Sequence, residues 1–399
     1  MNFKGKHIVL GVTGSIAAYK ACGLVSHLRQ MGAEIRVIMT EHATELVASR
    51  LFAELSGNPV AVNMFGKVTN FDVRHIALAA WADIFVVAPA TANIIGKVAS
   101  GIGDDMLSTS LISAHSPILF VPAMNTHMFD NPIVQDNIRK LHNFGYHFVD
   151  PDSGHLACNA SGKGRFPEES KIFSAMDQIL NGRGLLKGKK VLITAGGTRE
   201  AIDPVRYIGN YSSGKMGYAI ARAALREGAI VHLISTNPSL PHPEGADIEY
   251  VSSAVEMKQA VDKQYDTSDV VVMAAAVADY RPAAVADQKI KKETMTSLDL
   301  KLTLNPDILL GLGERKQNQV LVGFAAETND VIAHGREKLV RKNLDLLVAN
   351  DVSSPDSGFH VDENQVSLLT PDGHVSSYPR MAKEDIGTLI IEKIANIMK

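Results

Sequence analysis

The feature that most constrains the fold is the stretch 190–217, where a short apolar run passes into glycines and then into polar side chains. Residues 191–193 are typical of a buried strand, and the glycines at 196–197 follow where such a strand hands over to a phosphate-binding turn. The polar residues beyond them are Thr198, Arg199, Glu200, Asp203, Arg206, Asn210, Ser212, Ser213 and Lys215. Because a purely structural loop needs less hydrogen-bonding capacity, we expect a ligand site here.

The same kind of opening occurs twice in the chain. Lys4-Gly-Lys-His-Ile-Val-Leu is echoed by Lys187-Gly-Lys-Lys-Val-Leu-Ile. A single hydrophobic core rarely grows beyond about 250–300 residues, so a chain of 399 residues is expected to hold two domains. We place them at residues 1–186 and 187–399.

Charge and cysteine content exclude several classes of protein. The formal net charge of −3 gives no electrostatic case for binding nucleic acid or an anionic membrane. There are two cysteines, Cys22 and Cys158, so a disulfide framework is not expected and a reducing compartment is the default. The N-terminus has no signal-peptide pattern, and no apolar run is long enough to span a bilayer.

The first half reads as β-α-β units. Apolar strands are predicted at residues 8–12, 35–39, 83–88 and 117–121, with an amphipathic helix at 17–28. Polar clusters at 89–93 and 122–125 follow two of these strands. Because such units pair in parallel and ligands bind beyond the carboxyl ends of the strands, these clusters are expected to line a site.

The second half continues the pattern. Strands are predicted at residues 230–234, 270–274, 320–324, 346–348 and 365–369, with helices at 217–227, 330–342 and 383–398. The middle helix would place His334, Lys338 and Lys342 on one face, and the last helix is expected to be structural. The predicted fold class is therefore α/β, with two three-layer domains and mostly parallel sheets.

Neither glycine turn matches a common nucleotide motif. The first turn, Gly11-Val-Thr-Gly14-Ser15, is not G-x-G-x-x-G, and Thr40 stands at the end of the second strand instead of an acid. A dinucleotide is thus disfavoured against a mononucleotide phosphate or an ordinary turn. The segment 209–215 resembles a P-loop, but Met216 replaces the hydroxyl residue that binds magnesium, leaving anion binding through backbone N–H groups.

Several single residues have two readings. His75 at a predicted helix start is either a base or structural, and Asn125 either orients a carboxylate or caps a helix. Cys158, between glycines and hydroxyls, favours a chemical role, and Asp279 either holds a nucleotide or metal or caps a helix. Six basic residues could either bind a triphosphate together or form a solvated surface. They are Lys289, Lys291, Lys292, Lys338, Arg341 and Lys342.

Taken together, these motifs resemble a known family over essentially the whole chain. The chain is similar to the bacterial bifunctional family that fuses phosphopantothenoylcysteine decarboxylase to phosphopantothenate–cysteine ligase in coenzyme A biosynthesis. In the first half the resemblance is carried by Gly14-Ser15-Ile16, His75, Pro89-Ala-Thr-Ala-Asn93, Pro122-Ala-Met-Asn125 and Ala157-Cys158. In the second half it is carried by Ala195-Gly-Gly-Thr-Arg-Glu, Ser212-Ser-Gly-Lys-Met-Gly217, Lys289-Ile-Lys-Lys, Asn305-Pro-Asp-Ile and Gly323-Phe-Ala-Ala-Glu-Thr.

For the first half the resemblance implies a flavodoxin- or Rossmann-like domain that uses FMN to decarboxylate phosphopantothenoylcysteine to phosphopantetheine. His75 would act as base, Asn125 would hold the carboxylate, and Cys158 would donate a proton. The FMN-binding residues implied are Gly14, Ser15, Ile16, Thr40, Ala90, Thr91 and Asn93.

For the second half it implies a Rossmann-like ligase that joins cysteine to phosphopantothenate through an acyl-cytidylate formed from CTP. Lys289 would serve activation, Asn210 the intermediate, and Asp279 the magnesium ion. The CTP-binding residues implied are Met273, Ala274, Ala275, Asp279, Lys289, Pro306, Asp307, Ile308, Leu309, Phe324, Lys338 and Lys342. The substrate-binding residues implied are Asn210, Ser212, Ser213, Gly214 and Lys215.

The resemblance further implies a cytoplasmic homo-oligomer, a dodecamer built from trimers of the flavin domain and dimers of the ligase domain. Its partners would be small-molecule substrates, with no nucleic acid and no membrane. Two other classes remain open on the residues alone: a nicotinamide oxidoreductase on two Rossmann-like domains, and a flavoprotein that binds or regulates without catalysis.

Overall fold

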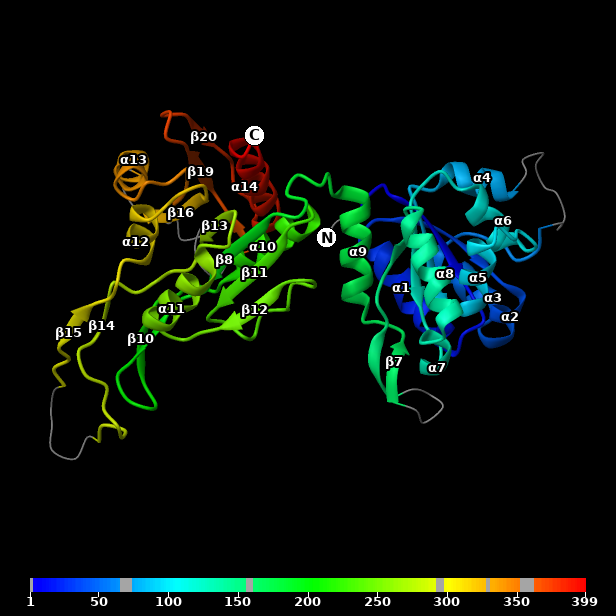
Figure 1. Cartoon of the computed structure of the whole chain (residues 1–399), viewed down its shortest axis with the longest axis horizontal. Helices are drawn as coiled ribbons and strands as arrows, with labels where there is room; N and C mark the ends of the chain where they lie inside the picture. Colours follow the sequence, from blue (N-terminus) through cyan, green and yellow to red (C-terminus); the bar gives the residue numbers. More distant parts are fainter. Residues whose placement is uncertain (1–2, 65–73, 156–160, 292–297, 328–330, 352–361) are drawn as a thin grey trace. The chain divides into compact units, whose positions relative to one another are not determined.

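The computed structural model describes residues 3–64, 74–155, 161–291, 298–327, 331–351 and 362–399. The chain divides into two compact units, Met1–Asn181 and Gly182–Lys399, whose elements are labelled in Figure 1. None of the helices within the described ranges is long and apolar enough to cross a membrane. Both units are α/β with mostly parallel sheets.

The first unit is built on a five-stranded parallel sheet with the order β2-β1-β3-β4-β5. This is the order of flavodoxin-like sheets, in which the strand order reverses between β1 and β3 and ligands bind at that point. The strands are β1 (His7–Val12), β2 (Glu34–Met39), β3 (Ile84–Ala90), β4 (Ile118–Pro122) and β5 (His147–Phe148), with a separate hairpin of β6 (Asp152–His155) and β7 (Ser161–Arg165).

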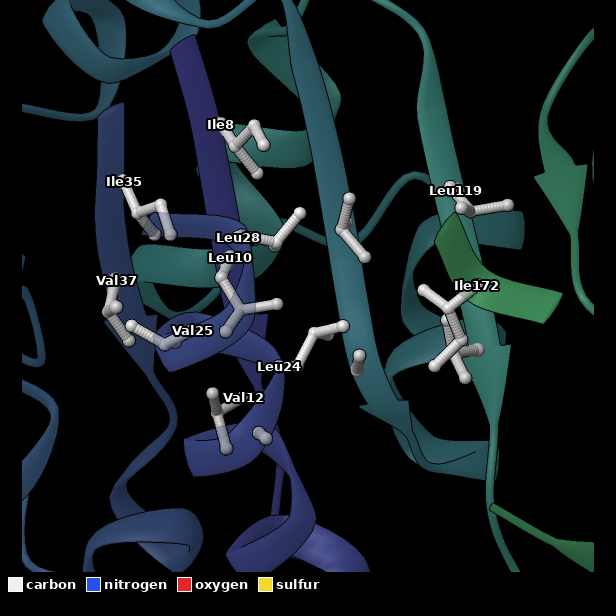
Figure 2. Packing of buried hydrophobic residues seen from close by; sticks show 14 of the residues in the cluster. Ile8, Leu10, Val12, Leu24, Val25, Leu28, Ile35, Val37, Leu119 and Ile172 are labelled. Atoms are coloured by element: carbon white, nitrogen blue, oxygen red, sulfur yellow. The ribbon is translucent and has the colours of Figure 1, made fainter. Parts of the chain in front are cut away.

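Helices cover both faces of this sheet. They are η1 (Ile16–Tyr19), α1 (Lys20–Gln30), α2 (Glu41–Leu46), α3 (Ser49–Ser56), α4 (Arg74–Trp81), α5 (Ala92–Ala99), α6 (Met106–Ser113), α7 (Thr126–Phe129), α8 (Pro132–Asn143) and α9 (Glu169–Asn181). On one face, Leu24 and Leu28 of α1 and Ile172 of α9 pack against Leu10 and its neighbours (Figure 2). The opposite face is covered by α4, α5 and α6. Burial of each such side chain stabilises the fold by roughly 1.5–3 kcal/mol.

The second unit has an eight-stranded sheet with the order β12-β11-β8-β13-β16-β17-β19-β20. The first six are parallel and follow the order typical of dinucleotide-binding Rossmann sheets, which reverses between β8 and β13. The last two are antiparallel. The strands of this sheet are β8 (Lys190–Ala195), β11 (Ile230–Ser235), β12 (Asp247–Tyr250), β13 (Val270–Met273), β16 (Val320–Glu327), β17 (Leu346–Asp351), β19 (Val366–Leu369) and β20 (Val375–Ser377).

Within the described residues, three antiparallel ribbons and five helices complete the second unit. The ribbons are β9 (Arg199–Ala201) with β10 (Tyr207–Gly209), β14 (Tyr280–Pro282) with β15 (Leu302–Leu304), and β18 (Glu363–Asn364) with β21 (Met381–Ala382). The helices are α10 (Lys215–Arg226), α11 (Ala254–Tyr265), α12 (Ile308–Glu314), α13 (Val331–Arg341) and α14 (Lys383–Ile397). Helices α10 and α14 cover one face of the sheet, and α11 and α12 cover the other.

A glycine sets the distance between α10 and α14. A Cβ atom at Gly387 would lie 2.8 Å from the backbone oxygen of Ala219 and 3.1 Å from the backbone nitrogen of Ile220. These are backbone atoms of a packed helix, so no side-chain rotation can make room. Gly387 therefore allows α14 to lie directly on α10.

We expect Gly387→Ala to destabilise the second unit by about 1–3 kcal/mol, because overpacking forces the two helices apart. Gly311→Ala is the matched control, since Gly311 is also helical and has open space where its Cβ would lie. That substitution should be stabilising by about 0.5–1 kcal/mol. Denaturant unfolding of the full chain measures both, and equal effects of the two variants would contradict the packing argument.

Candidate functional site

Two adjoining cavities lie where the strand order of the first sheet reverses, between β1 and β3. We call this place the switch point of the sheet. The Thr40 cavity, of about 900 Å³, is bordered by Thr13, Gly14, Thr40, Asn93 and Lys97 among others. The Asn125 cavity, of about 650 Å³, is bordered by Ser15, Ile16, Asn125 and Arg165 among others. Gly14, Thr91 and Met128 border both, so the two cavities meet over the turn that follows β1.

A buried threonine holds the ends of β1 and β3 together at this point. Thr13 is 1% exposed. Its Oγ1 donates to the Pro89 carbonyl at 2.7 Å and accepts the Thr91 N–H at 3.2 Å. Thr91 in turn caps α5. Thr13 was not among the predicted site residues, although it stands directly before Gly14, which was.

Other groups at the switch point fit a phosphorylated, hydroxyl-rich ligand. The Thr40 hydroxyl is buried and has no hydrogen-bond partner among the described residues. A Cβ at Gly14 would come within 2.7 Å of the Cβ of His42. The turn can therefore lie this close to α2 only because residue 14 has no side chain. Ser15 Oγ accepts the Ala17 N–H and thereby caps η1.

The predicted residues of the first half do not all border these cavities. Seven do: Gly14, Ser15, Ile16, Thr40, Thr91, Asn93 and Asn125. Ala90 is the last residue of β3 and is fully buried. His75 is half-buried in α4 and does not border either cavity. Cys158 lies outside the described residues.

Asn125 caps a helix and also borders a cavity. Its Oδ1 accepts the His127 N–H at 2.8 Å, which caps α7. The same residue borders the Asn125 cavity. Its capping bond fixes the side chain at the mouth of the ligand site.

A charged cluster in the Thr40 cavity was missed by sequence reasoning. Lys97 Nζ lies 2.7 Å from Asp104 Oδ1 and 2.9 Å from Asp105 Oδ2. Asp105 also forms a capping box with Ser108 at the start of α6. The pattern Asp105-x-x-Ser108 before an apolar run is a recognised cap signal, but nothing local indicates that Lys97 reaches it.

In the second unit, too, a buried threonine hydroxyl bonds to the segment after the neighbouring strand at the switch point, which lies between β8 and β13. Thr194, at the end of β8, is fully buried, and its Oγ1 accepts the Ala275 N–H at 3.1 Å. Thr198 Oγ1 accepts the Ala278 N–H at 2.9 Å. Asn210 Nδ2 donates to the Ala276 carbonyl at 2.7 Å, while its Oδ1 accepts the Ser212 N–H at 3.0 Å.

A cavity of about 240 Å³ lies over the glycine turn of this unit. We call it the glycine-turn cavity; residues 212–217, Phe324, Lys338, Asn350, Asn364 and Lys383 are among those that border it. The Oδ1 atoms of Asn350 and Asn364 are buried without a partner among the described residues. Unpaired buried acceptors are rare in proteins, which indicates that a ligand completes this cavity.

Lys383 was expected to be part of a structural helix, but the structure also places it in the glycine-turn cavity. It is 6% exposed. Burial, reinforced by the charge of Lys215, lowers the pKa of its ammonium group. Asn350 has a sequence signal that was available, since it lies at the carboxyl end of the buried strand β17. Lys383 and Asn364 have none.

A second cavity, of about 480 Å³, adjoins the first and shares Ala275, Val277, Phe324 and Lys338 with it. We call it the lysine cavity; Met273, Asp279, Lys342 and residues 304–309 also border it. Lys338 Nζ donates to the Phe324 carbonyl at 2.8 Å. The predicted set Met273, Ala275, Asp279, Pro306, Asp307, Ile308, Leu309, Phe324, Lys338 and Lys342 is thus brought together here. Ala274 borders the glycine-turn cavity instead.

Asp307 and Lys342 form an ion pair in the lysine cavity. Lys342 is 8% exposed, and its Nζ lies 2.8 Å from Asp307 Oδ2. Burial acts to raise the pKa of the Asp307 carboxyl, but hydrogen bonds from Lys342 and the Leu310 N–H outweigh it, and the pKa is lowered. The Lys342 N–H donates to the Lys338 carbonyl at 3.0 Å, so the last turn of α13 places the two lysines on one face, as the sequence predicts.

Among the predicted residues of the second half, Lys289 and Asn210 border neither cavity. Lys289 is exposed in the loop after β14 and is not among the residues bordering either cavity. Asp279 borders the lysine cavity, but no group of three His, Cys, Asp or Glu side chains suited to a metal occurs within the described ranges.

We expect Thr13→Val to destabilise the first unit by roughly 1–3 kcal/mol, because valine keeps the shape but leaves the Pro89 carbonyl and the Thr91 N–H unsatisfied. Thr13→Ser keeps the hydroxyl and should cost only about 0.8 kcal/mol for the lost methyl group. Thermal unfolding measures both. A valine variant at least as stable as the serine variant would rule out the bridge as a stabilising interaction.

The Asp307–Lys342 pair predicts a pH dependence. Because folding lowers the pKa of Asp307, the pair contributes stability above the unfolded value, about 3.9, and this stability is lost as the pH falls through the folded value. Asp307→Asn retains a residue suited to capping α12. The difference in unfolding free energy between the two proteins should therefore shrink on acidification from neutral pH. A difference that stays constant would argue against the pair.

Comparisons with known proteins match each unit separately. The model of the family described as Flavoprotein matches residues 1–181, and that of the DNA/pantothenate metabolism flavoprotein C-terminal domain matches residues 186–398. A crystal structure of the C-terminal domain of a coenzyme A biosynthesis bifunctional protein CoaBC is 41% identical, covers 54% of this chain and 98% of that one, and has a TM-score of 0.47.

Two curated relatives match along the whole chain. The coenzyme A biosynthesis bifunctional protein CoaBC of Bacillus subtilis is 48% identical over 399 residues, which is 99% of this chain and 98% of the relative. The protein of the same name from Escherichia coli is 43% identical over 397 residues, with the same coverage. The chain belongs to the family of bifunctional CoaBC proteins of coenzyme A biosynthesis, with a flavoprotein unit first and a pantothenate-metabolism unit second.

Proposed function

We propose that this chain converts phosphopantothenate to phosphopantetheine in two consecutive steps, one in each unit. The second unit ligates cysteine to phosphopantothenate at the expense of CTP, and the first unit decarboxylates the resulting phosphopantothenoylcysteine. The observation that carries this proposal is that each sheet has its own cavity system at its own switch point. Family membership over the full chain supports it.

The first unit is proposed to hold FMN over the turn after β1. The partnerless hydroxyl of Thr40 and the bare backbone at Gly14 suit a hydroxyl-rich phosphate ester. Ser15, Thr91 and Asn93 add polar groups, and cavities of this size are typical of cofactor sites. When bound, the flavin supplies a reversible two-electron oxidation of the cysteinyl thiol carbon, which makes loss of carbon dioxide favourable.

Three side chains are proposed to handle the substrate. Asn125, fixed by its cap to α7, holds the substrate carboxylate at the Asn125 cavity. His75 takes the proton of the substrate thiol, and Cys158 donates a proton to carbon after carbon dioxide has left. The roles of His75 and Cys158 rest on the family resemblance.

The second unit is proposed to bind CTP in the lysine cavity. Its ammonium groups, Lys338 and Lys342, offset the negative charge that develops as pyrophosphate leaves. Lys342 is held by Asp307, so this charge is oriented before the nucleotide arrives. Asp279 contributes one carboxylate to a magnesium ion whose other ligands are phosphate oxygens and water, as is usual for this metal.

Phosphopantothenate is proposed to bind beside the glycine turn, at Ser212, Ser213, Gly214 and Lys215. Its carboxylate attacks the α-phosphorus of CTP, giving an acyl-cytidylate and pyrophosphate, with Lys289 serving this activation. The amine of cysteine then attacks the acyl carbon, and CMP leaves as the amide forms. Asn210, which is bonded to both Ala276 and Ser212, holds the intermediate between these two loops.

We also propose that the chain works as a cytoplasmic homo-oligomer. Large apolar side chains are exposed on both units, including Ile133 and Phe144 on the first and Val205 and Tyr211 on the second. Exposed apolar surface of this kind marks interaction sites. Trimers of the first unit and dimers of the second would combine into a dodecamer.

The test is a single incubation of the purified chain with phosphopantothenate, cysteine, CTP and magnesium, followed by mass analysis. We expect phosphopantetheine, carbon dioxide and pyrophosphate, and none of these without CTP. Cys158→Ser should still release carbon dioxide but accumulate a product lacking one pair of hydrogens, because the final protonation fails.

The outcomes separate the parts of the proposal. If phosphopantothenoylcysteine formed but was not processed further, the proposed decarboxylase activity would be refuted. If no pyrophosphate formed in a CTP-dependent way, the proposed ligase activity would be refuted. If the Cys158→Ser variant still formed fully reduced phosphopantetheine, only the assignment of Cys158 as proton donor would be refuted. Turnover of NAD(P)H in place of these products would favour the oxidoreductase alternative.

A further inference from the structure

The loop that carries Lys289 is tied to the rest of the second unit through one carboxylate. The backbone N–H of Ile290, the next residue, donates to Asp203 Oδ2 at 3.2 Å. The guanidinium of Arg206 donates to the Ile290 carbonyl at 3.1 Å and to the same Asp203 oxygen at 2.5 Å. Both backbone groups of Ile290 are therefore held by the Asp203–Arg206 pair.

Few other contacts with the described residues hold this loop; one, at its start, is the Ala283 N–H, which donates to the Lys301 carbonyl at 2.8 Å. Residues 283–285 and 287–289 are exposed, and Ile290 is only half-buried. One further tie is the Ala286 N–H, which donates to the Ile202 carbonyl at 3.0 Å, directly before Asp203. Because hydrophobic burial is small, the position of the loop depends on these polar contacts with residues 202–206.

Asp203 is itself fixed. It is 2% exposed, and its Oδ1 accepts the N–H groups of Val205 and Arg206 at 2.8 Å each. The hydrogen bonds from the Arg206 guanidinium, together with those from the backbone, hold the pKa of this carboxyl well below its usual range against the effect of burial. The group is thus charged throughout the working pH range, as a permanent anchor must be.

We propose that Asp203 is a positioning residue for the ligase reaction: with Arg206 it clamps the backbone of Ile290 and so sets where the ammonium of Lys289 is presented. The inference rests on the proposed role of Lys289 in activation, but the clamp itself is a property of the backbone. Asp203 touches no substrate and acts only through the loop. This clamp would explain how an exposed lysine can serve a step that needs a fixed orientation. The backbone beside Lys289 is fixed, although the Lys289 side chain is not buried.

The test compares Asp203→Asn with Asp287→Asn in the full chain. Asp287 is an exposed carboxylate of the same loop, so its variant controls for the loss of one negative charge. We expect Asp203→Asn to lower kcat for CTP-dependent pyrophosphate release about 10- to 100-fold, since a small misplacement of a reacting group has effects of this size. KM for CTP should change little, because the residues bordering the lysine cavity are untouched. Asp287→Asn should retain the wild-type rate.

A double-mutant comparison separates positioning from general damage. In a Lys289→Ala background, Asp203→Asn should have almost no additional effect on kcat, because the group that it positions is already gone. Multiplicative effects of the two substitutions would overturn the proposal. A wild-type kcat in Asp203→Asn would also overturn it. Decarboxylation of supplied phosphopantothenoylcysteine should be unaffected, which checks that the first unit is intact.

Amide hydrogen exchange tests the clamp independently of any activity. In the wild type, the Ala286 and Ile290 amides should exchange more slowly than those of Asp287 and Gln288, which donate to none of the described residues. In Asp203→Asn the protection at Ile290 should be lost. A wild type without pyrophosphate release but with this exchange pattern would refute the proposed ligase and leave the clamp intact. Unprotected Ile290 in an active wild type would refute the clamp alone.

Discussion

A buried threonine hydroxyl at the switch point of each sheet is the interaction on which both sites depend. Where the strand order reverses, two neighbouring parallel strands lead their chains to opposite faces, and the backbone groups at their ends lose their sheet partners. Thr13 bonds to Pro89 and Thr91 in the first unit, and Thr194 bonds to Ala275 in the second. Each hydroxyl satisfies groups that would otherwise be buried unpaired, and so keeps the crevice open at a fixed width.

In the ligase unit, lysine side chains at the cavities are likewise paired with polar partners. Burying an ammonium ion is costly unless it is paired, and Lys342 meets Asp307 in the lysine cavity. Lys215, at the N-terminal end of α10, meets Asp362 at 2.6 Å. These carboxylates orient the lysines without closing the cavities. A cavity whose cations are already held in place costs little reorganisation when charge develops in a reaction.

Close packing of glycines explains why the cavities form where they do. Gly217 lies where a Cβ would come within 2.6 Å of the Cβ of Ala195, so α10 can start directly on the end of β8. Gly197 similarly leaves room for Asn210, whose Oδ1 would lie 2.1 Å from a Cβ there. The side chain of Asn210 can therefore reach across to Ala276. Larger residues at these glycines would fill the space in which the polar groups meet.

The sequence by itself determined the two α/β units, their buried strands and the polar clusters after them, because period, glycine turns and strand ends are local properties. Most of the residues that the family resemblance named also border the cavities. Only the tertiary structure decided that Lys97 meets Asp104, that Lys383 and Asn364 enter the glycine-turn cavity, and that Asp203 holds Ile290. These pairs are separated along the chain or lie on different elements, so their meeting depends on strand order and packing, which leave no local signal.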